Sequence, residues 1–169
     1  MFLLMISFMV ALALVLVAMP KVIPYLHKLK FGQVEREEGL ASHKKKGGTP
    51  TMGGVVFVLA AVIAAFVVNY KNITNPNLIL ITIVLVGYSL IGFIDDALII
   101  LKHQNEGLKA WQKFLMQAIL AVGCYLYLEN FVPGFTTEVT IPIVKVNIDF
   151  GWFYAVLVFI MFTGESNGV

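Results

Sequence analysis

The sequence predicts an all-α fold: a polytopic integral membrane helix bundle with about five transmembrane helices and a small extracytoplasmic β-hairpin. Three observations support it: the composition, the spacing of the apolar blocks and the placement of the basic residues. Of the 169 residues, 59% are hydrophobic and only 13% are charged, whereas soluble domains average about half apolar and a quarter charged. We expect residues 1–169 to form a single membrane domain.

Five apolar blocks define the expected helices. A helix that crosses a bilayer needs about 20 mostly apolar residues, within a range of about 17–25. The first and third blocks satisfy this length, the second does so with its polar start, and the last two need flanking residues such as Trp111 or Gly164. The blocks are Met1–Met19, Thr51–Tyr70, Asn77–Ile94, Phe114–Leu128 and Phe150–Thr163.

Two of the predicted elements have alternatives. The first block could be a secretory signal peptide, but it lacks a basic start and is longer than an ordinary signal h-region, so we expect a retained helix. The segment Thr136–Phe150 alternates apolar and polar residues on both sides of Pro142. This pattern favours a hairpin over a helix, and we assign it a structural role.

The basic residues predict the orientation in the membrane. Of the twelve Lys and Arg residues, ten lie within Lys21–Lys46 and Lys102–Lys113, and only Lys71 and Lys145 lie in the alternate loops. Positive charge collects in cytoplasmic loops. We therefore expect the N-terminus outside the cytoplasm and the end of the chain inside.

The segment Ser42–Gly54 (SHKKKGGTPTMGG) is the first candidate for chemistry. Unpaired N–H groups at the start of the following helix attract phosphate, glycines let the backbone approach an anion, and Lys46 would add a full charge. The segment is not a Walker A loop, because no Lys-Ser/Thr follows its glycines. An equally weighted alternative is a basic anchor against anionic headgroups.

Asp95 and Asp96, at the inner end of the third block, are the second candidate. Two carboxylates inside an apolar run are costly near a membrane and indicate function, and we expect them at a helix C-terminus, where the dipole disfavours negative charge. A hard cation such as Mg²⁺ would relieve both penalties. The alternative is a solvated pair that marks the membrane edge, and we favour the functional interpretation.

Both candidates lie on the cytoplasmic side in the expected topology. An anion-binding backbone with lysine, next to a carboxylate pair for Mg²⁺, provides the ingredients of phosphoryl transfer, with a lipid as acceptor or product. The one cysteine, Cys124, excludes an intrachain disulfide, and the three histidines show no ligand spacing.

With these residues the sequence resembles the phospho-N-acetylmuramoyl-pentapeptide transferases, a bacterial family of polyprenyl-phosphate sugar-phosphate transferases. HKKKGGTPTMGG is similar to the family's first cytoplasmic signature, and TPTMGG is specific to it. IGFIDD followed by GLKAWQKFLMQ is similar to the second signature, and SNGV to the opening of a third. The resemblance spans the whole chain.

The resemblance implies an enzyme that couples UDP-MurNAc-pentapeptide to undecaprenyl phosphate with Mg²⁺. The products would be lipid I and UMP, in the first membrane step of peptidoglycan synthesis. By position, it implies catalytic roles for Asp95, Asp96, Lys46 and Lys113, metal binding by Asp95 and Asp96, and substrate binding by Thr51 and Asn167.

The implied setting is the bacterial inner membrane, which the chain crosses several times, with its active face toward the cytoplasm. The expected partners are the two substrates and membrane lipid. A dimer is compatible with the sequence, and no nucleic-acid partner is expected.

Two departures from the family pattern qualify the resemblance. The family's Asp-Asp-x-x-Lys has Ile99 at the lysine position, although Lys102 follows one turn later. The chain also reaches only about halfway through a family member, so we expect it to represent the N-terminal half and to be inactive by itself. The alternatives are a fragment that only binds lipid or partner helices, and a transferase for another sugar phosphate, against which TPTMGG argues.

Overall fold

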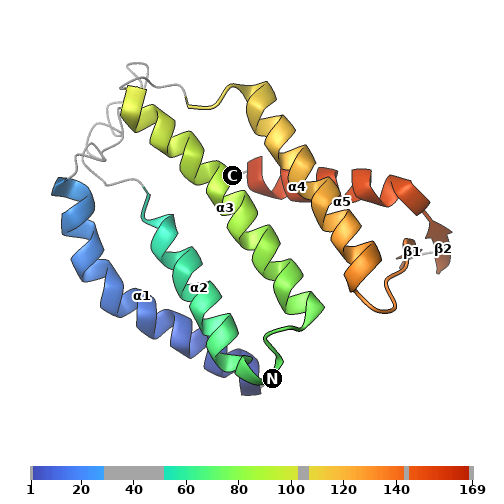
Figure 1. Ribbon diagram of the computed structural model, residues 1–169, viewed down its shortest axis with the longest axis horizontal. Coiled ribbons are helices and arrows are strands. Elements are labelled where there is room, and N and C mark those ends of the chain that lie inside the picture. The colour runs from blue at the N-terminus through green and yellow to red at the C-terminus, as the bar shows by residue number, and fades with distance from the viewer. Residues whose placement is uncertain (1, 29–51, 103–106, 143–144, 168–169) are drawn as a thin grey trace. The chain divides into compact units, whose positions relative to one another are not determined.

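The computed structural model describes residues 2–28, 52–102, 107–142 and 145–167. Within these residues, five α-helices fall on the five predicted apolar blocks, which confirms the all-α prediction (Figure 1). The elements are α1 (Phe2–Lys28), α2 (Gly54–Val68), η2 (Tyr70–Asn72), α3 (Pro76–Lys102), α4 (Ala110–Phe131), β1 (Glu138–Ile141), β2 (Val146–Asp149), η3 (Gly151–Phe153) and α5 (Tyr154–Asn167).

The helices have the surface of a membrane protein. Among the described residues, α1, α3 and α4 are long and apolar enough to cross a bilayer, and α2 and α5 are shorter apolar helices. Large apolar side chains remain exposed along α1, for example Phe8 at 66% and Val17 at 70%. A soluble monomer rarely exposes so much contiguous apolar surface, whereas lipid covers it at no cost.

The contacts divide the chain into two units, and the first contains Met1–Ile73 and Ser89–Lys109. In this unit α1 packs along α2 (Figure 1). Ala60 and Ala64, one turn apart on α2, are 4% and 1% exposed. Small residues of this kind let helices approach closely in a membrane, where apolar side chains gain little by leaving lipid.

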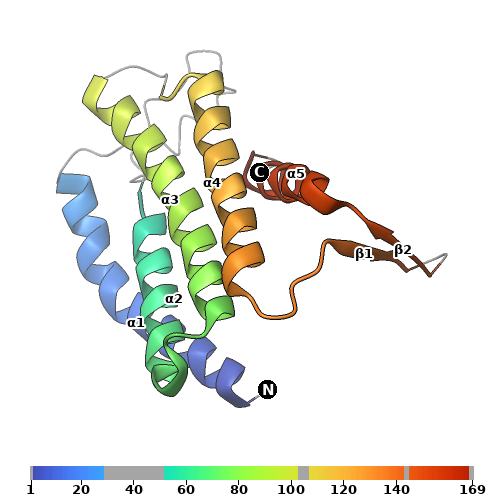
Figure 2. The same cartoon turned by 45° about the vertical axis from the view of Figure 1, so that its right-hand side comes forward.

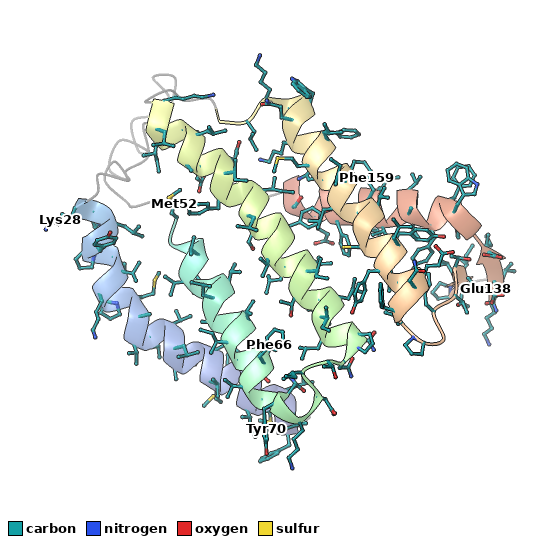
Figure 3. All side chains as sticks on the ribbon, in the orientation of Figure 1. Lys28, Met52, Phe66, Tyr70, Glu138 and Phe159 are labelled. Atoms are coloured by element: carbon teal, nitrogen blue, oxygen red, sulfur yellow. The ribbon has the colours of Figure 1, made fainter. Side chains whose placement is uncertain are left out.

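The second unit contains Thr74–Tyr88 and Ala110–Val169. Here α4 packs against α5, and the rings of Phe114 and Phe159 meet edge to face with their centroids 4.9 Å apart. Figure 3 shows Phe159 on α5 beneath α4. Gly87 of α3 lies against Leu120 of α4, where a Cβ would come within 2.6 Å of a Leu120 methyl. Glycine therefore allows this close approach.

The predicted hairpin is present between α4 and α5 (Figure 2). β1 and β2 pair antiparallel, with Glu138 opposite Asp149 and Ile141 opposite Val146. The Thr137 hydroxyl and the Gly151 N–H both donate to Oδ1 of Asp149. These hydrogen bonds, the first more than the second, lower the pKa of the Asp149 carboxyl and close the base of the hairpin.

Candidate functional site

The start of α2 is the first part of the site. Its N-cap is Gly53, and the Val55 N–H donates to the Met52 carbonyl at 3.3 Å. Met52 has φ +70°, a left-handed conformation that costs a residue with a Cβ about 1–2 kcal/mol. Such local strain persists where the surrounding structure enforces it, and it concentrates at functional sites.

The second part of the site is the aspartate pair on α3. The helix does not end at Asp96 but continues to Lys102, so the expectation that the pair lies at a helix C-terminus is wrong. Residues 97–101 are Ala, Leu and Ile, which contain no helix breaker and let the helix run on. The helix dipole acts mainly on the last turn, and the pair therefore escapes most of that penalty.

The two carboxylates have different surroundings. Consecutive residues on an α-helix project about 100° apart. Oδ1 of Asp95 accepts the N–H of Leu108 at 2.7 Å, in the segment that leads into α4. Asp96 instead lines a cavity that the start of α2 also lines. The pair that looks symmetric in the sequence thus has one member toward a loop and one toward a cavity.

The cavity measures about 220 Å³ and lies within the first unit. Its lining residues are Met52, Gly54, Val55, Val58, Ser89, Gly92, Phe93 and Asp96. Figure 3 shows Met52 where the chain enters α2. The wall combines backbone of the glycine-rich segment, one carboxylate and one hydroxyl with apolar side chains. It can accept a polar head group next to an apolar chain.

The residues at this cavity fit part of a magnesium site. Among the described residues, no three His, Cys, Asp or Glu side chains gather closely enough to hold a metal ion. Mg²⁺ in proteins commonly uses one or two carboxylates and completes its six positions with water and substrate phosphate oxygens. The Asp96 carboxylate in the cavity wall meets that minimum, and metal binding by both aspartates stays a prediction.

The remaining predicted site residues have different outcomes. Lys46 and Thr51 lie outside the described residues. Lys113 is half-buried in the first turns of α4, and Asn167 is the last residue of α5, both in the second unit. Ile99, at the family's lysine position, is half-buried in α3, whereas Lys102 is exposed at the end of that helix.

Gly107 is a site residue that sequence reasoning missed. A Cβ there would lie 2.7 Å from the Asp95 carbonyl oxygen and would press on the Asp95 carboxylate. The glycine therefore lets residues 107–108 close over Asp95. GLK was part of the second signature, but nothing in the pattern alone singled out its glycine.

Gly107→Ala is expected to lower the melting temperature of the protein in detergent, because overpacking a close contact costs about 1–3 kcal/mol. Gly123→Ala on α4 is the matched control, since a Cβ there meets nothing within 4 Å and alanine favours a helix. Thermal unfolding followed by circular dichroism compares the two. Equal melting temperatures for Gly107→Ala and the parent would contradict the close approach.

Comparisons with known proteins extend these observations. Residues 46–58 match the model of phospho-N-acetylmuramoyl-pentapeptide-transferase signature 1. This match covers the first turn of α2 and the cavity residues Met52, Gly54, Val55 and Val58.

Curated relatives match over nearly the whole chain, and each is named phospho-N-acetylmuramoyl-pentapeptide-transferase. The protein from Halalkalibacterium halodurans is 41% identical over 98% of this chain and 51% of its own length. The Bacillus subtilis protein is 42% identical over 89% of this chain and 46% of its own length. The chain therefore spans about half the length of the curated relatives that it matches.

Proposed function

We propose that this chain belongs to the phospho-N-acetylmuramoyl-pentapeptide-transferase family, whose members it matches over about half of their length, and that it forms the membrane-embedded first half of such an enzyme. The proposed reaction transfers phospho-MurNAc-pentapeptide from UDP-MurNAc-pentapeptide to undecaprenyl phosphate, with lipid I and UMP as products. One observation carries the proposal: the signature segment at the start of α2 and Asp96 of α3 line the same cavity.

The proposed chemistry is a displacement at phosphorus. An oxygen of the lipid phosphate forms a bond to the β-phosphorus of the nucleotide sugar, and the bond from that phosphorus to the bridging oxygen breaks, so UMP leaves with the bond electrons. Asp96 would hold Mg²⁺ at the cavity, with Asp95 as the second predicted ligand. When bound, the ion neutralises phosphate charge.

The other residues of the chain would bind and orient the substrates. Lys46 and Lys113 carry positive charge that would pair with phosphate oxygens in charge-assisted hydrogen bonds. Backbone N–H groups at the start of α2 would point toward an anion in the cavity. Apolar walls such as Val58 and Phe93 would receive the beginning of an isoprenoid chain. This arrangement would keep the lipid phosphate at the membrane surface, where a soluble nucleotide sugar reaches it.

A chimera tests the proposed function. It joins residues 1–169 to the half of the Halalkalibacterium halodurans relative that this chain does not cover, and the relative itself serves as the control. We expect UMP release that requires UDP-MurNAc-pentapeptide, undecaprenyl phosphate and Mg²⁺. A folded chimera that releases no UMP would refute the proposal, and activity only with another UDP-sugar would indicate a transferase of different specificity.

The proposed orientation places the cavity on the cytoplasmic side of a bacterial inner membrane, because ten of the twelve Lys and Arg residues lie within Lys21–Lys46 and Lys102–Lys113, in the helix ends and loops of that side. Single cysteines at Ser42 and Asn105, in a Cys124→Ala background, should resist a membrane-impermeant maleimide in intact cells. A cysteine at Lys145, in the opposite loop, should react. Efficient labelling at Ser42 or Asn105 before the cells are lysed would reverse the orientation.

A further inference from the structure

Gln117 is an unexpected residue in α4. It is 2% exposed, and it is the one buried polar or charged residue in the part of the chain that the structure describes. It lies in a helix that is apolar enough to cross a membrane. A buried amide without hydrogen bonds is costly in such surroundings, so its partners indicate why it is there.

Gln117 connects α4 to the end of α5. Its Nε2 donates to the Ser166 hydroxyl at 3.1 Å, and that hydroxyl donates to the Thr163 carbonyl at 3.3 Å. The chain of hydrogen bonds therefore runs from an α4 side chain to the α5 backbone. Both residues belong to the second unit. Gln117 is the buried member of this chain, whereas Ser166 is exposed at the end of α5.

Gln117 and Ser166 each lie close along their helix to a residue of the proposed site. Gln117 is four residues after Lys113, so both project from one face of α4. Ser166 directly precedes Asn167, the last residue of α5. The hydrogen bond thus joins the two elements that carry one predicted catalytic lysine and one predicted substrate-binding asparagine.

We infer that Gln117 is a positioning residue, whose hydrogen bond to Ser166 fixes the end of α5 against α4 and so sets where the chain continues at Asn167. The roles of Lys113 and Asn167 in this inference rest on the proposed function. The inference that the hydrogen bond positions α5 is independent of the proposed function.

Stability alone gives little reason for this pair. Hydrogen bonds between membrane helices contribute modestly to stability, and replacing both partners by apolar groups of similar shape is nearly neutral. Helices α4 and α5 are already joined by the edge-to-face contact of the Phe114 and Phe159 rings. The Gln117–Ser166 hydrogen bond lies beyond this apolar contact, and it fixes the direction of the last turn of α5.

Four variants separate position from stability. Gln117→Met keeps the length of the side chain and removes the donor, and Ser166→Ala removes the hydroxyl. The double variant Gln117→Met/Ser166→Ala removes both partners, and Ser166→Thr keeps a hydroxyl. Thr82→Val is the matched control, because it removes a hydroxyl that donates to the Leu78 carbonyl of its own helix.

The first measurement is the distance between spin labels at Leu115 and Glu165, two exposed residues of the second unit, in the 169-residue chain with Cys124→Ala. Gln117→Met, Ser166→Ala and the double variant should broaden and shift the distance distribution. Ser166→Thr and Thr82→Val should leave it narrow. The melting temperature of the double variant should return close to that of the parent.

The second measurement is turnover in the chimera. Gln117→Met and the double variant should lower kcat/KM for the nucleotide sugar by about 3- to 18-fold, the range that interhelical hydrogen bonds in membranes support. Ser166→Thr should restore it. If the label distances stay unchanged in Gln117→Met and Ser166→Ala, the inference is wrong. If turnover recovers together with the melting temperature in the double variant, the pair is only structural. If the distances change but even the parent chimera is inactive, the proposed function fails and the positioning of α5 stands.

Discussion

Asp96→Asn is expected to reduce turnover of the chimera by at least about 100-fold, the loss typical of removing a group that supports charge at a reacting phosphate or metal. The change is nearly isosteric, and it removes a negative charge from a cavity wall that is otherwise polar backbone, one hydroxyl and apolar side chains. Removing that charge relieves a burial cost. Folding should therefore be unharmed while activity falls, and UMP release measured beside thermal unfolding separates the two effects.

Asp149→Asn is the matched control, because it makes the same substitution on the exposed hairpin between α4 and α5. Its turnover should equal that of the parent. Asp95→Asn is also expected to lose activity, although its amide oxygen can still accept the Leu108 N–H. If Asp96→Asn turned over as fast as Asp149→Asn, Asp96 would be reduced to a marker of the membrane edge.

The helices were predictable because apolar runs of bilayer length have few other uses. The residues at which the helices end were harder to predict. Block one ends at Met19, before Pro20, yet α1 continues through Pro20 and Pro24 to Lys28. Proline is tolerated in membrane helices because neighbouring groups satisfy the freed carbonyls. A hydropathy pattern therefore locates a helix but underestimates its polar end.

The aspartate helix shows the same limit. The sequence placed Asp95 and Asp96 at the end of an element, whereas α3 extends to Lys102. Residues 97–101 contain no helix breaker, but two adjacent charged residues after an apolar run suggest the end of a membrane helix when only hydropathy is considered. The end of the helix matters, because it determines which groups the carboxylates face.

The residues that form the site were predictable from the sequence, but the directions in which their side chains point were not. The glycine-rich segment and the aspartates were expected on one side of the membrane, and Met52, Gly54 and Asp96 do line one cavity. The different directions of Asp95 and Asp96 depend on the rotation of α3, which no motif records. The sequence signal for Gln117 is its position as a polar residue inside an apolar run, which indicates a specific partner.

The 169-residue chain alone is expected to transfer no phospho-sugar, in contrast to the chimera. Mg²⁺ needs about six oxygen ligands, and no three His, Cys, Asp or Glu side chains gather closely enough to hold a metal ion among the described residues, so these residues supply only the beginning of such a site. The chain also covers about half the length of its relatives, and the residues that complete a nucleotide pocket would come from the other half. The purified chain, given UDP-MurNAc-pentapeptide, undecaprenyl phosphate and Mg²⁺, should release UMP no faster than a protein-free control. Steady UMP release that Asp96→Asn abolishes would show instead that the first half carries a complete active site.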